Sequence, residues 1–329
     1  LVADSAAFTY DLIRKYGMDC DAEQRGWVQP AHTPGRVKLA ERRVAAWAKR
    51  GAPVEMLDRA GIEGVTGSRF WHGGWMNRSG GRVQPLAFCR ELARVAIAKG
   101  TQVFTGSRAK GISRQGARWR VSTAGGAVLA ERVVIATHAY SNGLWPGLVR
   151  TVFPVNSYQM ATVPLPEEVQ RSLLPGAAAC SDTQGDLHFF RLSPEGRLVT
   201  GGGLVFHPDY ARRLRRRIGE RVARVFPQVG VPEFDFVWHG AVGVTLDSRP
   251  HAHELAPGVL AWLGCNGRGV ALATCVGAQF ARACLGAPLA QLPLPFSSLS
   301  PVAGHAIGRR VASFALALFR WRDKQEYKP

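Results

Sequence analysis

The 329-residue sequence has little lysine and little negative charge. Only seven of its 42 basic residues are lysines, and no lysine occurs between Lys110 and Lys324. A Schiff-base lysine is therefore excluded from the centre of the chain. Asp and Glu number 24, which leaves a net charge of +18 that is spread along the sequence. Because a GC-rich genome also yields many arginines, and no nucleic-acid module accompanies them, we expect no nucleic-acid partner.

Long apolar runs are missing as well. The low-charge stretch 256–281 contains five glycines, Asn266 and Arg268, and the apolar stretch 311–319 is nine residues long. A membrane-spanning helix needs about 20 apolar residues, so we expect no transmembrane segment, and no signal peptide is visible. The six cysteines show no CxxC spacing and the histidines no metal-ligand spacing. These features favour reduced thiols in a cytoplasmic protein without a metal site.

Several catalytic motifs are absent too. The chain contains no GxSxG, no HExxH and no GxGxxG. The first two absences argue against a serine hydrolase of the nucleophile-elbow type and against a zinc metalloprotease. A chemistry that needs few protein acids and bases is favoured instead, such as hydride transfer to a bound cofactor.

The helices and strands expected from the sequence follow two patterns that alternate along the chain. An α/β style is predicted by a helix at 85–100, a hairpin at 118–123 and 127–130, and a helix at 270–285, with strands at 101–105, 132–136 and 259–263. The middle of the chain favours an antiparallel sheet, with strands at 152–163, 187–192, 197–201 and 234–244. Gly201, Gly202 and Gly203 follow one of these strands and indicate a bend or close packing.

An arginine cluster lies on one predicted helix of this middle region. Arg212, Arg213, Arg215, Arg216 and Arg217 alternate with Leu214, Ile218, Val222 and Val225 at helical spacing. This pattern predicts an amphipathic helix with an arginine-rich solvent face. A patch for nucleic acid or an anionic membrane is the functional alternative.

A glycine loop is the sharpest local feature. Gly264, Gly267 and Gly269 lie with Cys265, Asn266 and Arg268 between the predicted strand 259–263 and the helix that begins at Val270. Glycines let the backbone approach a ligand, and the N–H groups of a helix start favour an anion or a group that becomes anionic. A tight strand-to-helix turn without a ligand is the alternative.

A resemblance covers nearly the whole chain. Residues 71–75, 80–86, 133–140, 190–192, 238–240, 247–250 and 264–270 follow one another in the order found in the FAD-dependent amine and amino-acid oxidases, the D-amino acid oxidase (DAO) superfamily. The sequence is most similar to the gamma-glutamylputrescine oxidoreductase-like branch. That family begins with a strand, a GxGxxG turn and a helix, which this chain lacks.

The resemblance implies a fold and its domains. We expect a Rossmann-like FAD/NAD(P)-binding domain (α/β) interleaved with an antiparallel-sheet substrate domain (α+β). The FAD-binding domain would comprise residues 1–24, 76–148 and 251–329, and the substrate domain 25–75 and 149–250. Because Leu1 is not a start Met and residues 3–16 already have a helical pattern, we expect that an upstream segment has been lost. Strands 133–136 and 259–263 would then each lose a neighbour, and FAD would be held weakly.

The resemblance also implies site residues. Ala109 matches a position that faces the adenine, and Ala136 and Thr137 match a strand end beside the ADP part. Gly264, Asn266, Gly267, Arg268, Gly269 and Val270 match the loop at the flavin pyrimidine edge. Trp71 and His72 match the substrate face of the ring and are candidate catalytic residues together with Arg268, whose charge would stabilise reduced flavin. Candidates for the substrate-pocket wall are Tyr158, His188, Phe190 and Trp238, although each aromatic side chain is also a candidate for the sheet core.

The function implied is oxidation of an amine or amino acid at a C–N bond. The substrate would give its α-hydride to flavin N5, and the imine would then be hydrolysed. The electron acceptor stays open between O2 and an electron carrier such as a quinone, because the lysine that the sarcosine-oxidase branch uses for oxygen has no counterpart between residues 111 and 323. A non-catalytic remnant of the fold, or a basic binding protein that kept it, is the alternative from another class. The sequence does not indicate an oligomeric state.

Overall fold

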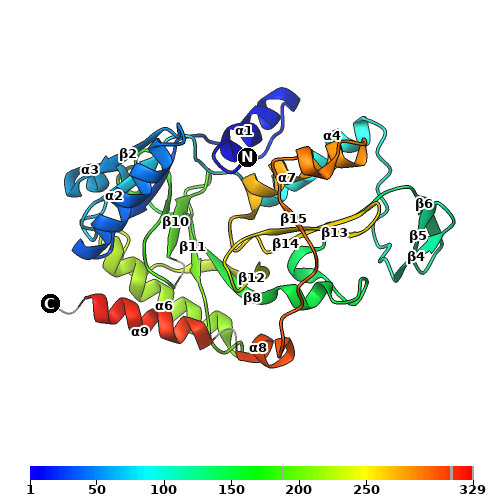
Figure 1. The fold of residues 1–329 in the computed structure, drawn as a ribbon. Coiled ribbons are helices and arrows are strands. Elements are labelled where there is room, and N and C mark those ends of the chain that lie inside the picture. The colour runs from blue at the N-terminus through cyan, green and yellow to red at the C-terminus, as the bar shows by residue number, and fades with distance from the viewer. Residues whose placement is uncertain (187, 312–313, 328–329) are drawn as a thin grey trace. The chain divides into compact units, whose positions relative to one another are not determined.

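A computed structural model describes residues 1–186, 188–311 and 314–327. The chain divides into two compact units, each assembled from three segments (Figure 1). Unit 1 comprises residues 1–12, 89–155 and 241–312, and unit 2 comprises residues 13–88, 156–240 and 313–329. None of the described helices is long and apolar enough to cross a lipid bilayer.

Unit 1 is built on a four-stranded sheet. Its strand order is β15 (Phe296–Ser297), β13 (His251–Ala256), β14 (Val259–Leu263) and β7 (Val133–Ile135). β14 pairs in parallel with β7 and antiparallel with β13, so it has a neighbour on both sides. The expectation that strand 259–263 would lack a neighbour is therefore wrong, whereas β7 lies at the edge of the sheet.

Two further sets of elements complete unit 1. A second sheet contains β4 (Gly111–Gln115), β5 (Arg118–Ser122) and β6 (Ala127–Ala130), of which β5 and β6 confirm the predicted hairpin. The helical elements are α7 (Gly269–Cys284), α8 (His305–Val311), η1 (His138–Tyr140), η2 (Leu148–Thr151) and η3 (Leu289–Gln291). Helices α1 (Ser5–Tyr16) and α4 (Pro85–Ala98) each continue from one unit into the other along the chain.

One predicted strand of this unit is wrong. Residues 101–105 form neither a helix nor a strand, and the side chains of Val103 and Phe104 are 51% and 65% exposed. A short apolar run becomes a strand only where another strand offers its backbone groups, and no described strand does so here.

Unit 2 is built on an eight-stranded sheet. Its strand order is β12 (Phe234–Val244), β8 (Phe153–Thr162), β11 (Leu198–Gly202), β10 (Phe189–Leu192), β9 (Ala179–Ser181), β1 (Trp27–Pro30), β3 (Gly74–Asn77) and β2 (Val54–Leu57). From β8 to β2, neighbouring strands pair antiparallel except β1 with β9, which agrees with the predicted antiparallel character. The strand predicted at 187–192 is observed from Phe189, and Leu187 lies outside the described residues.

The helices of unit 2 are α2 (Pro34–Ala48), α3 (Arg59–Thr66), α5 (Glu167–Ser172), α6 (Tyr210–Val225) and α9 (Ala315–Glu326). Helix α6 packs against β11 and buries Leu214, Ile218, Val222 and Val225, as its spacing predicts. The predicted solvent face needs one correction. Arg217 turns inward and pairs with the buried Asp186, because a carboxylate there lacks water and needs a cation.

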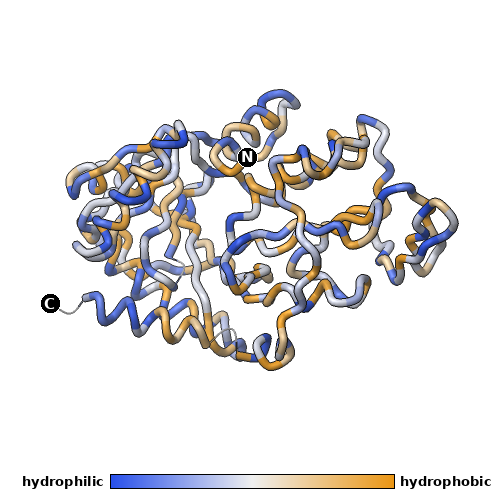
Figure 2. The backbone as a smooth tube through the Cα atoms, in the orientation of Figure 1, coloured by the Kyte–Doolittle hydropathy of each residue, from blue (hydrophilic) through white to orange (hydrophobic). Residues whose placement is uncertain are grey.

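Close packing explains the glycines at 201–203. A Cβ on Gly201 would lie 2.0 Å from the carbonyl oxygen of Tyr158, and one on Gly203 would lie 2.5 Å from Leu316 Cδ1. The prediction of close packing at these glycines is confirmed. The main core of unit 2 lies between this part of the sheet and α6. Figure 2 shows hydrophobic and hydrophilic residues interspersed along the chain.

Candidate functional site

The glycine loop lies at the carboxyl edge of the parallel strand pair in unit 1. β7 ends at Ile135, which is paired with Ala261 of β14, so Ala136 and Thr137 leave the sheet at the same edge as Gly264. Ala136 and Thr137 are exposed. In parallel α/β sheets, ligands bind at the carboxyl ends of strands. The structure therefore brings together two of the predicted cofactor positions with the loop at 264–270.

His138 connects these two segments, and sequence reasoning missed it. Its Nε2 accepts a hydrogen bond of 2.9 Å from the Cys265 N–H, so the ring carries its proton on Nδ1. Burial lowers the pKa of His138, which favours this neutral form. The residue has a left-handed φ of 46°, and a Cβ on Gly243 would lie 2.9 Å from its Cε1. No motif in the sequence signals this arrangement.

Asn266 holds the loop from the other side. Its Oδ1 accepts from the Thr245 N–H at 3.0 Å, and its Nδ2 donates to the Gly264 carbonyl at 2.6 Å. With a φ of 51°, Asn266 adopts a left-handed conformation that asparagine tolerates better than most residues. Its amide is therefore used within the protein rather than left for a ligand.

Three backbone N–H groups of the loop before α7 are used within the protein. Cys265 donates to His138, Asn266 to the Gly243 carbonyl at 3.1 Å, and Arg268 to the Cys265 carbonyl at 3.0 Å. A turn must satisfy its own backbone groups where it packs against the protein. The start of α7 is different, because its N-cap residue Arg268 makes no side-chain cap.

The loop leaves room for a ligand at this helix start. A Cβ on Gly267, which has a φ of 80°, would meet nothing within 4 Å. The Arg268 side chain is exposed and makes no ion pair with any residue that the structure describes. Val270 is 45% exposed in the first turn of α7. The uncapped N–H groups, the open space and the unpaired cation fit the electron-rich pyrimidine edge of a flavin.

Ala109 is distant in sequence from the residues of the glycine loop. It is half-buried, just before β4, where the Lys110 N–H donates to the Ser122 carbonyl at 2.7 Å. Its predicted contact with adenine stays a prediction.

The predicted catalytic residues of unit 2 have different surroundings. Trp71 is fully buried, and its Nε1 donates to Asp182 Oδ2 at 3.4 Å. Its ring packs edge-on against Phe190 and Phe226. His72 is exposed and donates its backbone N–H to the Ala31 carbonyl at 3.0 Å.

Three of the predicted pocket-wall residues are buried and the fourth is exposed. Tyr158 is 1% exposed and its hydroxyl lies 2.8 Å from His207 Nδ1, whereas Trp238 on β12 is 43% exposed. Phe190 is 1% exposed in the core cluster. His188 is 5% exposed, its Nδ1 lies 3.4 Å from Asp182 Oδ2, and burial lowers its pKa. These surroundings match the core interpretation of the aromatic residues, and their roles in substrate binding stay predictions.

The opposite face of the same strands carries residues that the sequence reasoning did not select. Residues that are paired across neighbouring strands lie on the same face of the sheet. Gln159, Phe189 and Gly201 therefore share one face, and Phe190 and Met160 lie on the other. The Phe189 ring lies against Gly201, where a Cβ would be 2.7 Å from its Cζ. Arg191 lies on this face as well, is half-buried, and donates from Nη1 to the Val83 carbonyl at 2.9 Å. The alternation along 189–191 was the signal that could have identified them.

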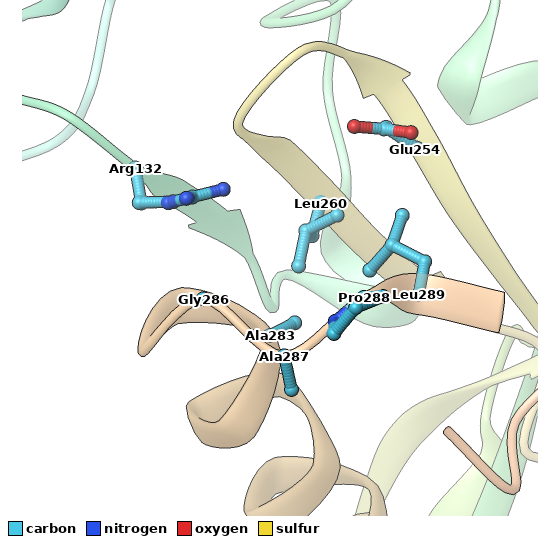
Figure 3. Close-up of a pocket in the computed structure, with 8 residues that line it drawn as sticks. All are labelled: Arg132, Glu254, Leu260, Ala283, Gly286, Ala287, Pro288 and Leu289. Atoms are coloured by element: carbon cyan, nitrogen blue, oxygen red, sulfur yellow. The ribbon is translucent and has the colours of Figure 1, made fainter. Parts of the chain in front are cut away.

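Unit 1 also contains a cavity of about 220 Å³ at the other end of α7 (Figure 3). On one side it is lined by Arg132, just before β7, and by Glu254 and Leu260 of the sheet. On the other side it is lined by Ala283 in the last turn of α7 and by the residues 286–289 that follow the helix. None of the predicted site residues lines it.

Comparison with known proteins places the chain in a family. Residues 1–283 match the model of the family described as DAO, FAD dependent oxidoreductase. The chain belongs to this family. It is 30% identical over 233 residues to a probable oxidoreductase OrdL of Rhizobium meliloti, covering 71% of this chain and 54% of that protein. It is 27% identical over 262 residues to the gamma-glutamylputrescine oxidoreductase of Escherichia coli, covering 79% and 61%.

Solved structures show the same fold. Glycine oxidase from Geobacillus kaustophilus superimposes with a TM-score of 0.76 at 21% identity, covering 92% of this chain and 82% of that one. L-proline dehydrogenase from P. horikoshii gives a TM-score of 0.76 at 18% identity, covering 88% and 79%. The DAO resemblance and the Rossmann-like fold class expected from the sequence are confirmed. The chain spans between 54% and 64% of the length of the first curated relatives it matches.

Proposed function

We propose that this chain forms the catalytic part of an FAD-dependent oxidoreductase that oxidises an amine or amino acid at a C–N bond. The observation that carries the proposal is the uncapped start of α7, with Arg268 beside it, at the carboxyl edge of the β7–β14 pair in a DAO-family chain. When bound, the flavin supplies a two-electron hydride acceptor. Relatives named for gamma-glutamylputrescine and neighbours named for glycine and proline support an amine or amino-acid substrate.

The residues of the glycine loop have two roles in this proposal. The N–H groups of Gly269 and Val270 and the cation of Arg268 would hold the pyrimidine edge of the flavin and would stabilise negative charge there. His138 and Asn266 keep the loop in the conformation that presents these groups, through their bonds to Cys265 and Thr245. Ala136 and Thr137 border the same edge of the sheet and would contact the ADP part.

The substrate side of unit 2 has two candidate faces. Tyr158, His188 and Phe190 are enclosed in the core, so we assign first contact with substrate to the half-buried face of Gln159, Phe189 and Arg191. Protein side chains there would orient the substrate and exclude water. A guanidinium such as that of Arg191 suits a carboxylate group.

The electron acceptor in this proposal is O2 or an electron carrier. The chain has no lysine between Lys110 and Lys324 that could act on oxygen as in the sarcosine-oxidase branch. A cytoplasmic location is part of the proposal and agrees with the six cysteines, none of which forms a disulfide in the part of the chain that the structure describes.

The test is anaerobic reduction of the FAD-loaded chain by a panel that includes gamma-glutamylputrescine, glycine and L-proline. At least one substrate should bleach the flavin absorbance. Arg268→Ala should slow bleaching roughly tenfold or more, because a charge-assisted contact is worth about 1.5–3 kcal/mol. Arg282→Ala, near the other end of α7, is the matched control, and Arg191→Met should raise KM for carboxylate-bearing substrates. If the FAD-loaded Arg268→Ala variant is reduced as fast as the unmodified chain, Arg268 has no part in the mechanism. If the chain binds no FAD, the proposal is refuted.

A further inference from the structure

Helix α9 buries charged side chains beside one leucine and exposes several large apolar side chains. Its inward side carries Leu316, Arg320 and Asp323. Asp323 is 6% exposed and accepts from the Gly185 N–H at 3.0 and 3.3 Å. Arg320 pairs with Asp186 at 3.1 Å. The helix is therefore attached to unit 2 mainly through charged and polar contacts.

The outward side of α9 is apolar. Phe314, Leu318 and Trp321 are 48%, 48% and 57% exposed, and their spacing of four and three residues places them on one side of the helix. Phe206, which is 55% exposed, extends this row by packing edge-on against Phe314 at 5.6 Å. These four residues are called the apolar stripe below. In Figure 2 the hydrophobic colour marks the first half of α9, and the hydrophilic colour marks the second half.

Several positive charges lie near the apolar stripe. Arg322 and Lys324 are exposed on α9, and Arg213 of α6 donates to the Phe206 carbonyl at 2.9 Å. Helices α6 and α9 lie side by side (Figure 1). The acidic residues of α9 are engaged elsewhere, since Asp323 faces inward and Glu326 pairs with Arg36.

We propose that the apolar stripe binds the surface of a membrane that contains anionic lipids. An exposed tryptophan with leucine and phenylalanine, bordered by arginine and lysine, is the composition of helices that lie in the membrane interface. A bilayer accepts a row of side chains without a matching groove, and its negative surface attracts the flanking cations. A second copy of this chain fits less well, because both copies would bring the same positive charges into the contact, and the acidic residues of α9 are engaged elsewhere.

The test is flotation of the purified chain with vesicles of phosphatidylcholine and phosphatidylglycerol in equal parts, and with vesicles of phosphatidylcholine alone. The chain should float with the mixed vesicles and much less with the neutral ones. The double variant Leu318→Ser with Trp321→Ser keeps the net charge, so general attraction to the vesicles is unchanged. We expect it to bind at least tenfold more weakly, at both 0.1 M and 0.5 M salt.

Two controls distinguish an effect of the apolar stripe from the general effect of losing an exposed apolar side chain or two positive charges elsewhere on the protein. Leu285→Ser removes an apolar side chain that is 89% exposed in unit 1, and should float like the unmodified chain. Arg118→Gln with Arg120→Gln removes two exposed positive charges from β5, whereas Arg322→Gln with Lys324→Gln removes two beside the stripe. The second pair should weaken binding at 0.1 M salt roughly tenfold more than the first.

Three results would overturn the proposal. One is equal flotation of the unmodified chain and the Leu318→Ser, Trp321→Ser variant. Another is equal weakening by the two charge pairs. The third is a stripe-dependent dimer in light scattering without stripe-dependent flotation, which would assign the stripe to a second copy.

Discussion

Acid should destabilise unit 2 through one buried histidine, His32. Its side chain is fully buried, and the Thr183 hydroxyl accepts from the His32 backbone N–H at 3.2 Å while lying 2.7 Å from His32 Nδ1. The Thr183 hydroxyl is therefore the hydrogen-bond partner of Nδ1, while Nε2 lies 3.4 Å from Glu326 Oε2. Burial lowers the pKa of His32 to about 4, against the weaker opposing effects of Asp182 and Glu326.

The sign of the effect follows from where the proton binds. In the unfolded chain the histidine pKa is about 6.5, so between pH 6.5 and pH 4 the unfolded state binds more protons than the folded state. The stabilisation is complete above pH 6.5 and is lost as the pH falls toward 4. The difference between 6.5 and about 4 corresponds to about 3 kcal/mol in the free energy of unfolding.

The assay is urea unfolding of the unmodified chain and of His32→Asn at intervals from pH 7.5 to pH 4. The unmodified chain should lose about 3 kcal/mol more than His32→Asn over this range, because other titrating groups are shared and cancel in the comparison. His72→Asn, which removes an exposed histidine of the same unit, should follow the unmodified chain. Parallel loss in the unmodified chain and His32→Asn would refute the argument that the buried ring resists protonation.

Two other substitutions test the packing around the site. His138→Ala leaves the Cys265 N–H without its acceptor and should lower the stability of unit 1 by about 1–3 kcal/mol, measured by urea unfolding, together with FAD retention on gel filtration. An unchanged stability and FAD content would show that the loop does not need His138. Gly201→Ala places a methyl 2.0 Å from the Tyr158 carbonyl oxygen and should destabilise unit 2 by several kcal/mol or prevent soluble expression. Gly64→Ala, where the added Cβ meets nothing within 4 Å in α3, should instead leave thermal unfolding unchanged or raise its midpoint.

The parts of the fold that local sequence patterns dictate could be predicted from them. Strand β14 has the predicted bounds, and α6 buries the four apolar residues that its spacing selected. A buried strand or an amphipathic helix leaves a periodic signature in its own residues. The strand expected at 101–105 failed because strand formation depends on a partner from elsewhere in the chain.

The candidate site could be predicted only in part from the sequence, for the same reason. The glycine loop could be recognised because its composition is local, and its position at the carboxyl edge of β14 agrees with that interpretation. The bond from Cys265 to His138 joins residues 127 positions apart, and nothing in either segment indicates the other. Likewise, alternation along β10 separates Phe189 and Arg191 from Phe190, but it does not say which face α6 covers. Which side chains reach a ligand is decided by tertiary packing.

Helix α9 shows how far a periodic pattern can mislead. From the spacing of Phe314, Leu318 and Trp321, a helix in water would be expected to turn this row toward the core. In the structure, the positions facing inward are those of Arg320 and Asp323, which satisfy Asp186 and the Gly185 N–H in an otherwise buried loop. Turning the helix over would bury the apolar row, but it would leave the Gly185 N–H without its acceptor and would remove Arg320 from Asp186, which would then keep Arg217 as its arginine partner. Losing a buried hydrogen bond and part of a buried ion-pair network costs more than leaving a leucine or phenylalanine half-exposed. The orientation is thus set by the polar contacts, and the apolar row is left available for a second apolar phase such as the interface of a bilayer.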